Sequence, residues 1–132
     1  MTKSDCIPFF TSSVQAGFAS VADEHIEGYL DLNELVVKHP AATFFVRVAG
    51  ESMKDAGIYP GDILVVDRSL TAASGKIIVA CLDGEFLVKR FMPEGATIRL
   101  VSANPRFLDM KIDPEKSDFR IWGVVTYVIH AC

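Results

Sequence analysis

The sequence lacks a long hydrophobic run, and an ordinary membrane anchor is therefore not expected. Its longest apolar stretch, residues 121–132, spans about 12 residues and is interrupted by Gly123, Thr126 and His130, whereas a membrane-spanning helix needs about 20. Near the start, only Ile7–Phe10 is apolar before polar residues return, so no signal-peptide hydrophobic region is recognised. We expect a cytoplasmic protein, with a buried strand over residues 121–132.

Cysteine and histidine are too few and too scattered to predict a disulfide framework or a metal site. The chain has three of each: Cys6, Cys81 and Cys132, and His25, His39 and His130. An odd number of cysteines without a CxxC pair is typical of reduced thiols in a cytosolic protein. The histidines lack the close spacing of zinc ligands. We expect neither a cofactor nor a metal.

The chain also lacks an excess of basic residues. Lysine and arginine number 13 against 17 aspartate and glutamate, which gives a net charge of −4. Proteins that bind DNA tightly neutralise phosphates with basic side chains, so this charge has the wrong sign. Direct, tight DNA binding is not expected. The 132 residues suit one domain with a single core.

The pattern of small, polar and apolar residues divides the chain into an arm and a compact domain. Residues 1–30 have little periodicity and many small or polar side chains, which indicates an extended N-terminal arm. Residues 31–132 are expected to form the compact domain. It should begin with a short helix that Asp31 caps and Pro40 ends.

Most of the compact domain has the composition of β-strands. Six segments are rich in β-branched and aromatic residues and are separated by Gly, Pro, Asp or Asn. They are Thr43–Val48, Asp62–Val66, Lys76–Leu82, Glu85–Phe91, Thr97–Val101 and Arg120–His130. Between two of them, Asp83-Gly84 predicts a two-residue hairpin. The sequence therefore predicts a mainly β protein: a single compact β-rich domain with short helices and an extended N-terminal arm.

Ser52 and Lys89 are the candidate catalytic residues. Ser52 lies in a turn led by Gly50, where backbone N–H groups are expected to be unpaired, and Lys89 lies in an apolar strand. A serine hydroxyl becomes an effective nucleophile when a neighbouring base removes its proton. A lysine can be that base once desolvation lowers its pKa. Each residue also has an ordinary interpretation, because most Gly-x-Ser motifs are turns and most strand lysines face solvent.

The strand pattern leaves the burial of these charges open. Alternation places Lys89 on one strand face and Arg90 on the other, and both faces carry apolar residues. Two acids, Asp62 and Asp67, suggest a Ser-His-Asp triad instead. No histidine lies in a comparable block, so the pattern does not favour that triad.

Several blocks of the sequence resemble the LexA/UmuD family of self-cleaving serine peptidases, the UmuD branch more than the LexA branch. They are Gln15–Phe18, Asp31–Asn33, His39–Val46, Gly50–Met53, Gly57–Asp62 and Asp83–Arg90, and they cover most of the chain in the family's order. Lys89 follows Ser52 by 37 positions, a separation similar to the family's. Only 16 residues precede the Ala16-Gly17 bond, too few for the helical DNA-binding module of LexA-type repressors.

The resemblance implies a complete catalytic assignment. Ser52 would be the nucleophile and Lys89 the general base, with the backbone N–H groups of Glu51 and Ser52 as the oxyanion hole. The protein would cut its own Ala16-Gly17 bond. The resemblance further implies a homodimer activated by a RecA–single-stranded DNA filament in the SOS response. The processed form would then be an accessory subunit of an error-prone translesion polymerase, bound to a UmuC-like Y-family subunit.

Two other classes of function stay open at this point. One is a non-catalytic β-rich interaction or regulatory module of the same fold, against which the presence of both Ser52 and Lys89 argues. The other is a signal-peptidase-like enzyme with the same chemistry. That enzyme normally needs a membrane anchor, and the sequence has no stretch that predicts one.

Overall fold

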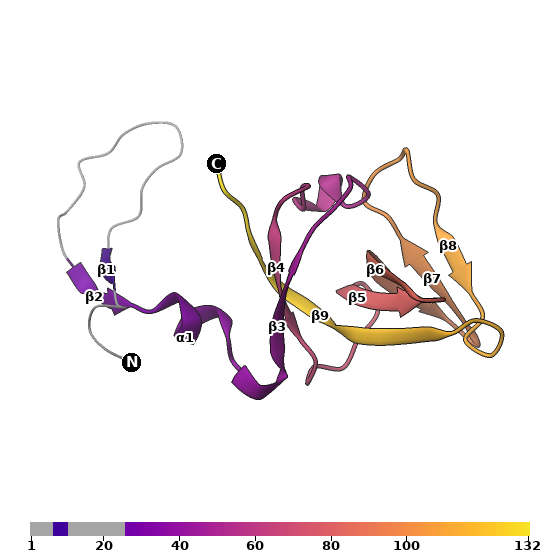
Figure 1. Ribbon diagram of the computed structural model, residues 1–132, viewed down its shortest axis with the longest axis horizontal. Coiled ribbons are helices and arrows are strands. Elements are labelled where there is room, and N and C mark those ends of the chain that lie inside the picture. The colour runs from indigo at the N-terminus through magenta and orange to yellow at the C-terminus, as the bar shows by residue number, and fades with distance from the viewer. Residues whose placement is uncertain (1–6, 11–25) are drawn as a thin grey trace. The chain divides into compact units, whose positions relative to one another are not determined.

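The computed structural model describes residues 7–10 and 26–132, and the chain divides into two compact units, residues 1–38 and 39–132 (Figure 1). Within the described residues, no helix has the length and apolar character needed to cross a membrane. The functional division into an arm over residues 1–30 and a peptidase domain over residues 31–132 stays a prediction.

The N-terminal unit contains a two-stranded sheet and a short helix. Strand β1 (Ile7–Phe10) pairs antiparallel with β2 (Ile26–Leu30), and α1 (Leu32–Val36) follows. The sequence pattern predicts neither strand, because Pro8 and Gly28 interrupt the β-forming residues.

Helix α1 begins as expected but ends early. The Asp31 carboxylate accepts a hydrogen bond from the Asn33 backbone N–H at 3.0 Å, so Asp31 is the N-cap, as predicted. The expectation that Pro40 ends this helix is wrong. Val37 already has extended dihedral angles, φ −109° and ψ 94°, and Pro40 instead begins a short 3₁₀ helix, Pro40–Ala42.

The C-terminal unit is built on one seven-stranded antiparallel sheet with the spatial order β3-β4-β9-β5-β6-β7-β8 (Figure 1). The strands are β3 (Thr43–Arg47), β4 (Ile63–Asp67), β5 (Ile77–Leu82), β6 (Glu85–Glu94), β7 (Thr97–Val101), β8 (Met110–Ile112) and β9 (Phe119–Ile129). A second 3₁₀ helix, Lys54–Ala56, lies between β3 and β4. The mainly β fold and the six predicted strands are confirmed, and β8 is an additional strand.

The hairpin between β5 and β6 is the one that the sequence predicts. Asp83 and Gly84 both have positive φ, 48° and 87°, which is the signature of a type I′ turn. Leu82 then pairs with Glu85, and the same register pairs Ile78 with Lys89. The turn therefore determines which residues lie beside Lys89.

The hydrophobic core consists of two clusters. The first contains Val48, Met53, Ile58, Leu64, Val66 and Val79, and the second contains Ile78, Ala80, Phe91, Leu100, Ile112 and Val124. Neighbouring residues of β5 belong to different clusters, so the two clusters lie on opposite faces of that strand. The first cluster includes Met53, the residue directly after Ser52.

Strand β9 joins the two halves of the sheet. It pairs with β4 on one side and with β5 on the other, with an irregular register at both pairings. The approach to β4 is very close at Gly123. A Cβ atom added there would lie 2.7 Å from Val66 Cγ1 and 2.9 Å from the Asp67 carbonyl oxygen, so a side chain does not fit.

The expectation of a buried strand over residues 121–132 is only partly right. The strand is present, but Gly123 and Val124 are its only fully buried residues. Five large side chains of β9 are exposed: Ile121, Trp122, Tyr127, Val128 and Ile129. The reason is that β9 is covered by strand pairing at its edges, while much of its face is not covered by other described residues.

Candidate active site

The Ser52 turn lies between β3 and the 3₁₀ helix Lys54–Ala56. Gly50 has a φ of +80°, a conformation that favours glycine, and it lies in the bend that follows β3. Met53 then enters the first core cluster and is only 2% exposed. This burial fixes the turn and leaves Ser52 half-buried beside a pocket. The helix begins two residues after Ser52 and is one turn long.

Lys89 is a buried charge on β6, with 8% of its surface exposed. Its Nζ donates a hydrogen bond to Ser102 Oγ at 2.9 Å and lies 5.6 Å from the centre of the Phe107 ring. Burial lowers the pKa of Lys89, because the neutral amine loses less hydration than the ammonium. Arg90, by contrast, is half-buried and donates to the Gly75 carbonyl oxygen at 2.7 Å.

Ser52 and Lys89 line the same pocket, which has a volume of about 290 Å³. Its walls come from the end of β3, the Ser52 turn and the start of β6. Phe86 lies at this pocket but is 59% exposed, so it contributes less to the burial of Lys89 than the sequence suggests. Among the described contacts, the Lys89 amine is bonded to Ser102 and not to Ser52.

The backbone N–H groups of Glu51 and Ser52 are not used in the hydrogen bonds of the described residues. Neither of their N–H groups donates a hydrogen bond to another described residue. The Glu51 carbonyl oxygen, in contrast, accepts two hydrogen bonds, from Asn104 Nδ2 at 2.9 Å and from the Lys54 N–H at 3.2 Å. The turn is therefore held through its carbonyl, while its N–H groups have no partner among residues 7–10 and 26–132.

Ser102 and Asn104 make contacts with the candidate site that sequence reasoning missed. Each follows β7, far along the chain from the residue that it bonds. The register of β6 and β7, in which Arg90 pairs with Val101, brings Ser102 next to Lys89. Nothing in the residue pattern gives that register, so no sequence signal identifies either contact.

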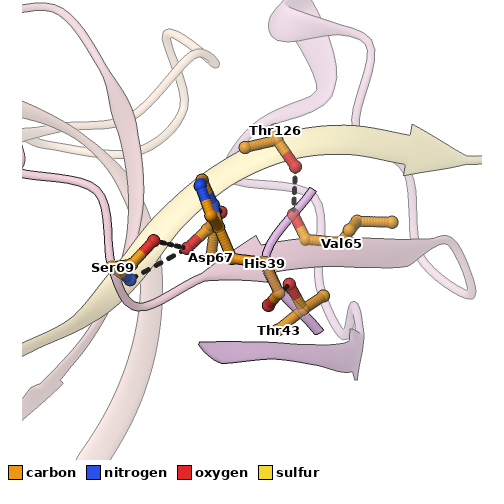
Figure 2. Close-up of polar contacts among 6 residues, drawn as sticks. All are labelled: His39, Thr43, Val65, Asp67, Ser69 and Thr126. Carbon is orange, nitrogen blue, oxygen red and sulfur yellow. Dashed lines mark hydrogen bonds and ion pairs between the residues drawn. The ribbon is translucent and has the colours of Figure 1, made fainter. Parts of the chain in front are cut away.

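Both aspartates of the alternative triad do have a histidine partner, contrary to the sequence interpretation. His39 Nδ1 lies 2.6 Å from Asp67, and His130 Nδ1 lies 2.5 Å from Asp62. The hydroxyl of Ser69 donates to the Asp67 carboxylate at 2.6 Å and not to His39 (Figure 2). A Ser-His-Asp triad needs the serine on the histidine, so this group is not one.

Hydrogen bonds stabilise both carboxylates in their charged form. The hydrogen bond with His39, followed by that from Ser69, lowers the pKa of Asp67 to about 2. Hydrogen bonds from His130 and from the Tyr59 N–H lower the pKa of Asp62 in the same direction. Neither acid faces the pocket that Ser52 lines. We therefore interpret both pairs as structural.

The expected cleavage site, Ala16-Gly17, lies outside the described residues. In the part of the chain that is described, no group of three or more His, Cys, Asp or Glu side chains is arranged to hold a metal ion.

Comparison with known proteins gives matches over nearly the whole chain. A family model described as Peptidase S24-like matches residues 8–126. Protein MucA of Salmonella typhimurium is 47% identical over 121 residues, which cover 92% of this chain and 82% of that protein. Protein ImpA of Shigella flexneri is 47% identical over 125 residues, with 93% and 83% covered. The LexA repressor of Ectopseudomonas mendocina is 41% identical over 116 residues, which cover 88% of this chain and 56% of the repressor.

Proposed function

The chain belongs to the Peptidase S24-like family, in the LexA/UmuD group of self-cleaving serine peptidases, and on this basis we propose that Ser52 and Lys89 are its catalytic dyad. The bond cut is Ala16-Gly17 of the chain itself. A RecA–single-stranded DNA filament triggers the cut. The processed form then serves an error-prone translesion polymerase as an accessory subunit.

One observation carries the proposal: Ser52 and the buried Lys89 line one pocket although 37 positions separate them. A buried lysine without a carboxylate partner costs stability, because its charge is desolvated. A lysine that acts as a base gains from the same burial, since its neutral form becomes more populated. Catalysis therefore accounts for a feature that stability alone does not.

The reaction follows from these groups. The neutral Lys89 amine takes the proton of the Ser52 hydroxyl while Oγ attacks the carbonyl carbon of Ala16. The N–H groups of Glu51 and Ser52 stabilise the resulting oxyanion. Collapse breaks the bond to the Gly17 nitrogen, which receives the proton from the Lys89 ammonium, and leaves an ester on Ser52. Water then hydrolyses that ester, with Lys89 again as the base.

The hydrogen bond from Lys89 to Ser102 is compatible with this role. A neutral amine has two N–H groups and one lone pair. One N–H can remain on Ser102 Oγ while the lone pair accepts the proton of Ser52. The bond thus restrains the side chain without occupying its basic site.

We propose the assembly on separate grounds. Exposed apolar side chains on β9, such as Ile121, Val128 and Ile129, are the kind of surface that a second copy covers in a homodimer. The RecA filament and a UmuC-like Y-family subunit are partners inferred from the resemblance to the UmuD branch.

The direct test is intact-mass analysis of the purified chain with and without a RecA–single-stranded DNA filament. We expect the filament to produce a fragment that begins at Gly17. Ser52→Ala and Lys89→Ala should each abolish the cut while circular dichroism stays unchanged. Lys89→Arg should fail too, because a guanidinium is not deprotonated in proteins. A new terminus other than Gly17, or cutting by any of these variants, would refute the assignment.

A further inference from the structure

The segment after β7, residues 102–107, contacts both the Ser52 turn and Lys89. Ser102 Oγ accepts the hydrogen bond from Lys89 Nζ, and the Phe107 ring lies beside the same amine. Toward the turn, the Ala103 carbonyl oxygen accepts from the Asp55 N–H at 2.7 Å. Asn104 Nδ2 donates to the Glu51 carbonyl oxygen at 2.9 Å. One short segment therefore holds the turn on both sides of Ser52.

The contacts of Asn104 determine the orientation of its side-chain amide. The Arg106 backbone N–H, which can only donate, lies 3.0 Å from Asn104 Oδ1. The amide nitrogen must then face the Glu51 carbonyl oxygen, which can only accept. Both ends of the amide are satisfied, so Asn104 is restrained at the turn.

The bond to Glu51 acts on Ser52 through the peptide that joins them. The Glu51 carbonyl and the Ser52 N–H belong to one planar trans unit and point in opposite directions. A donor that fixes the carbonyl therefore fixes the direction of the N–H as well. The same bond polarises the peptide and makes its N–H a stronger donor.

We propose that Asn104 is a positioning residue for the oxyanion hole, which it orients through the Glu51–Ser52 peptide. This inference rests on the proposed self-cleavage function and adds to it a residue that touches neither the substrate nor the reacting atoms. Its contribution is to the stability of the oxyanion and not to the proton transfer by Lys89.

Asn104→Asp separates this role from a general structural one. The aspartate keeps the oxygen that accepts from Arg106 but replaces the donor to Glu51 with a second acceptor. We expect the maximal rate of spontaneous self-cleavage at alkaline pH to fall about 10-fold or more, since loss of a whole oxyanion-hole donor costs about 100- to 1,000-fold. The uncharged variant Asn104→Ala should lose rate with no change in the pH at half-maximal rate, because it adds no charge beside Lys89.

Two further variants serve as comparisons. Asn33→Asp makes the same change of charge on the exposed face of α1 and should cleave like the wild type. Asn104→Ala removes the donor without adding charge and should lose as much rate as Asn104→Asp. Wild-type rates in Asn104→Ala would overturn the inference, because the defect of the aspartate would then be a charge effect. Melting temperatures, measured for all variants, confirm that the assay is run on folded protein.

A second readout keeps the inference distinct from the proposed function. Diisopropyl fluorophosphate phosphorylates an activated serine, and its phosphoryl oxygen occupies the oxyanion hole during the reaction. We expect slower labelling of Ser52 in Asn104→Asp than in the wild type, whether or not the chain cuts itself. Equal labelling would overturn the role of Asn104 and leave self-cleavage standing. A wild type that labels but never cuts would refute self-cleavage alone.

Discussion

Among single residues, Lys89 lies in surroundings that disfavour its charged form. Its side chain is almost wholly buried, and its described polar partner is a neutral hydroxyl rather than a carboxylate. Desolvation without ionic compensation lowers the pKa, in contrast to Arg99, whose bonds to Glu94 and Asp109 raise its pKa. The pKa values of these two basic side chains are therefore shifted in opposite directions by their surroundings.

The lowered pKa of Lys89 predicts the pH dependence of cleavage. Only the neutral amine is a base, so the spontaneous rate should rise with pH as that fraction grows. Half of the maximal rate should be reached at a pH below about 10.4, because 10.4 is the ordinary pKa of a lysine side chain and burial lowers that of Lys89. The measurement is the cleavage rate from pH 6 to 11, with circular dichroism as a check on the fold. A rate that is flat or falls with pH would exclude Lys89 as the titrating base.

The pair of His39 and Asp67 predicts how stability depends on acid. The pKa of Asp67 is lowered from 3.8 to about 2 in the folded state. The charged carboxylate therefore adds stability above about pH 4, and this contribution is lost as the pH falls toward 2. His39→Ala should raise the pKa of Asp67 and destabilise the protein at pH 6. Urea unfolding should show that the difference from the wild type shrinks between pH 4 and pH 2. An equal difference at pH 2 and pH 6 would contradict this linkage.

Residue identity alone identifies Ser52 and Lys89 as candidates but not the groups around them. A glycine-led turn and a lysine in an apolar strand are local patterns, readable within a few residues. The bonds of His39 to Asp67 and of Asn104 to Glu51 join positions 28 and 53 residues apart. Such contacts depend on the order and register of strands, which local patterns do not contain.

At the scale of elements, the contact between β4 and β9 limits what position 123 can hold. Gly123→Ala would place a methyl group within 3 Å of Val66 and of the Asp67 backbone, which is paired and has little freedom to move. We expect a loss of about 1–3 kcal/mol in the free energy of unfolding, as for other overpacked cores. Urea denaturation measures it. Gly28→Ala, where the added methyl meets nothing within 4 Å, is the matched control. A loss of the same size there would contradict crowding as the cause.

The sequence predicts those elements whose residue pattern is strong and confined to a few consecutive positions. Strands β4 and β5 contain uninterrupted runs of Ile, Leu and Val, and the Asp83-Gly84 turn has a specific dihedral requirement that Gly meets. Strand β8 has three residues, too short for alternation to be visible. Helix α1 ends at Val36, before Pro40, because Val37 already has extended dihedral angles, and nothing in the residue pattern marks that position.

At the scale of the whole molecule, cleavage should not change the net charge. Residues 1–16 contain one lysine, Lys3, and one acid, Asp5, so the product keeps a net charge of −4. A chain of residues 17–132 should therefore bind bare DNA no better than the full-length protein, while it binds a UmuC-like Y-family subunit. Fluorescence anisotropy with labelled DNA at low and high salt tests the first part. A gain in DNA affinity that salt abolishes would contradict it.

Strand β9 also determines when the proposed active site can form. The Ser52 turn belongs to the β3–β4 half of the sheet and Lys89 to the β5–β8 half, and β9 is the strand that joins them. A ribosome adds about 5–20 residues each second, so the last residue of β9 follows Ser52 by about 4–15 s. During that interval the nascent chain carries the proposed nucleophile, and soon the proposed base, without the strand that joins the two halves of the sheet. If Ser52 and Lys89 act as proposed, the arm is therefore not cut before β9 has been synthesised.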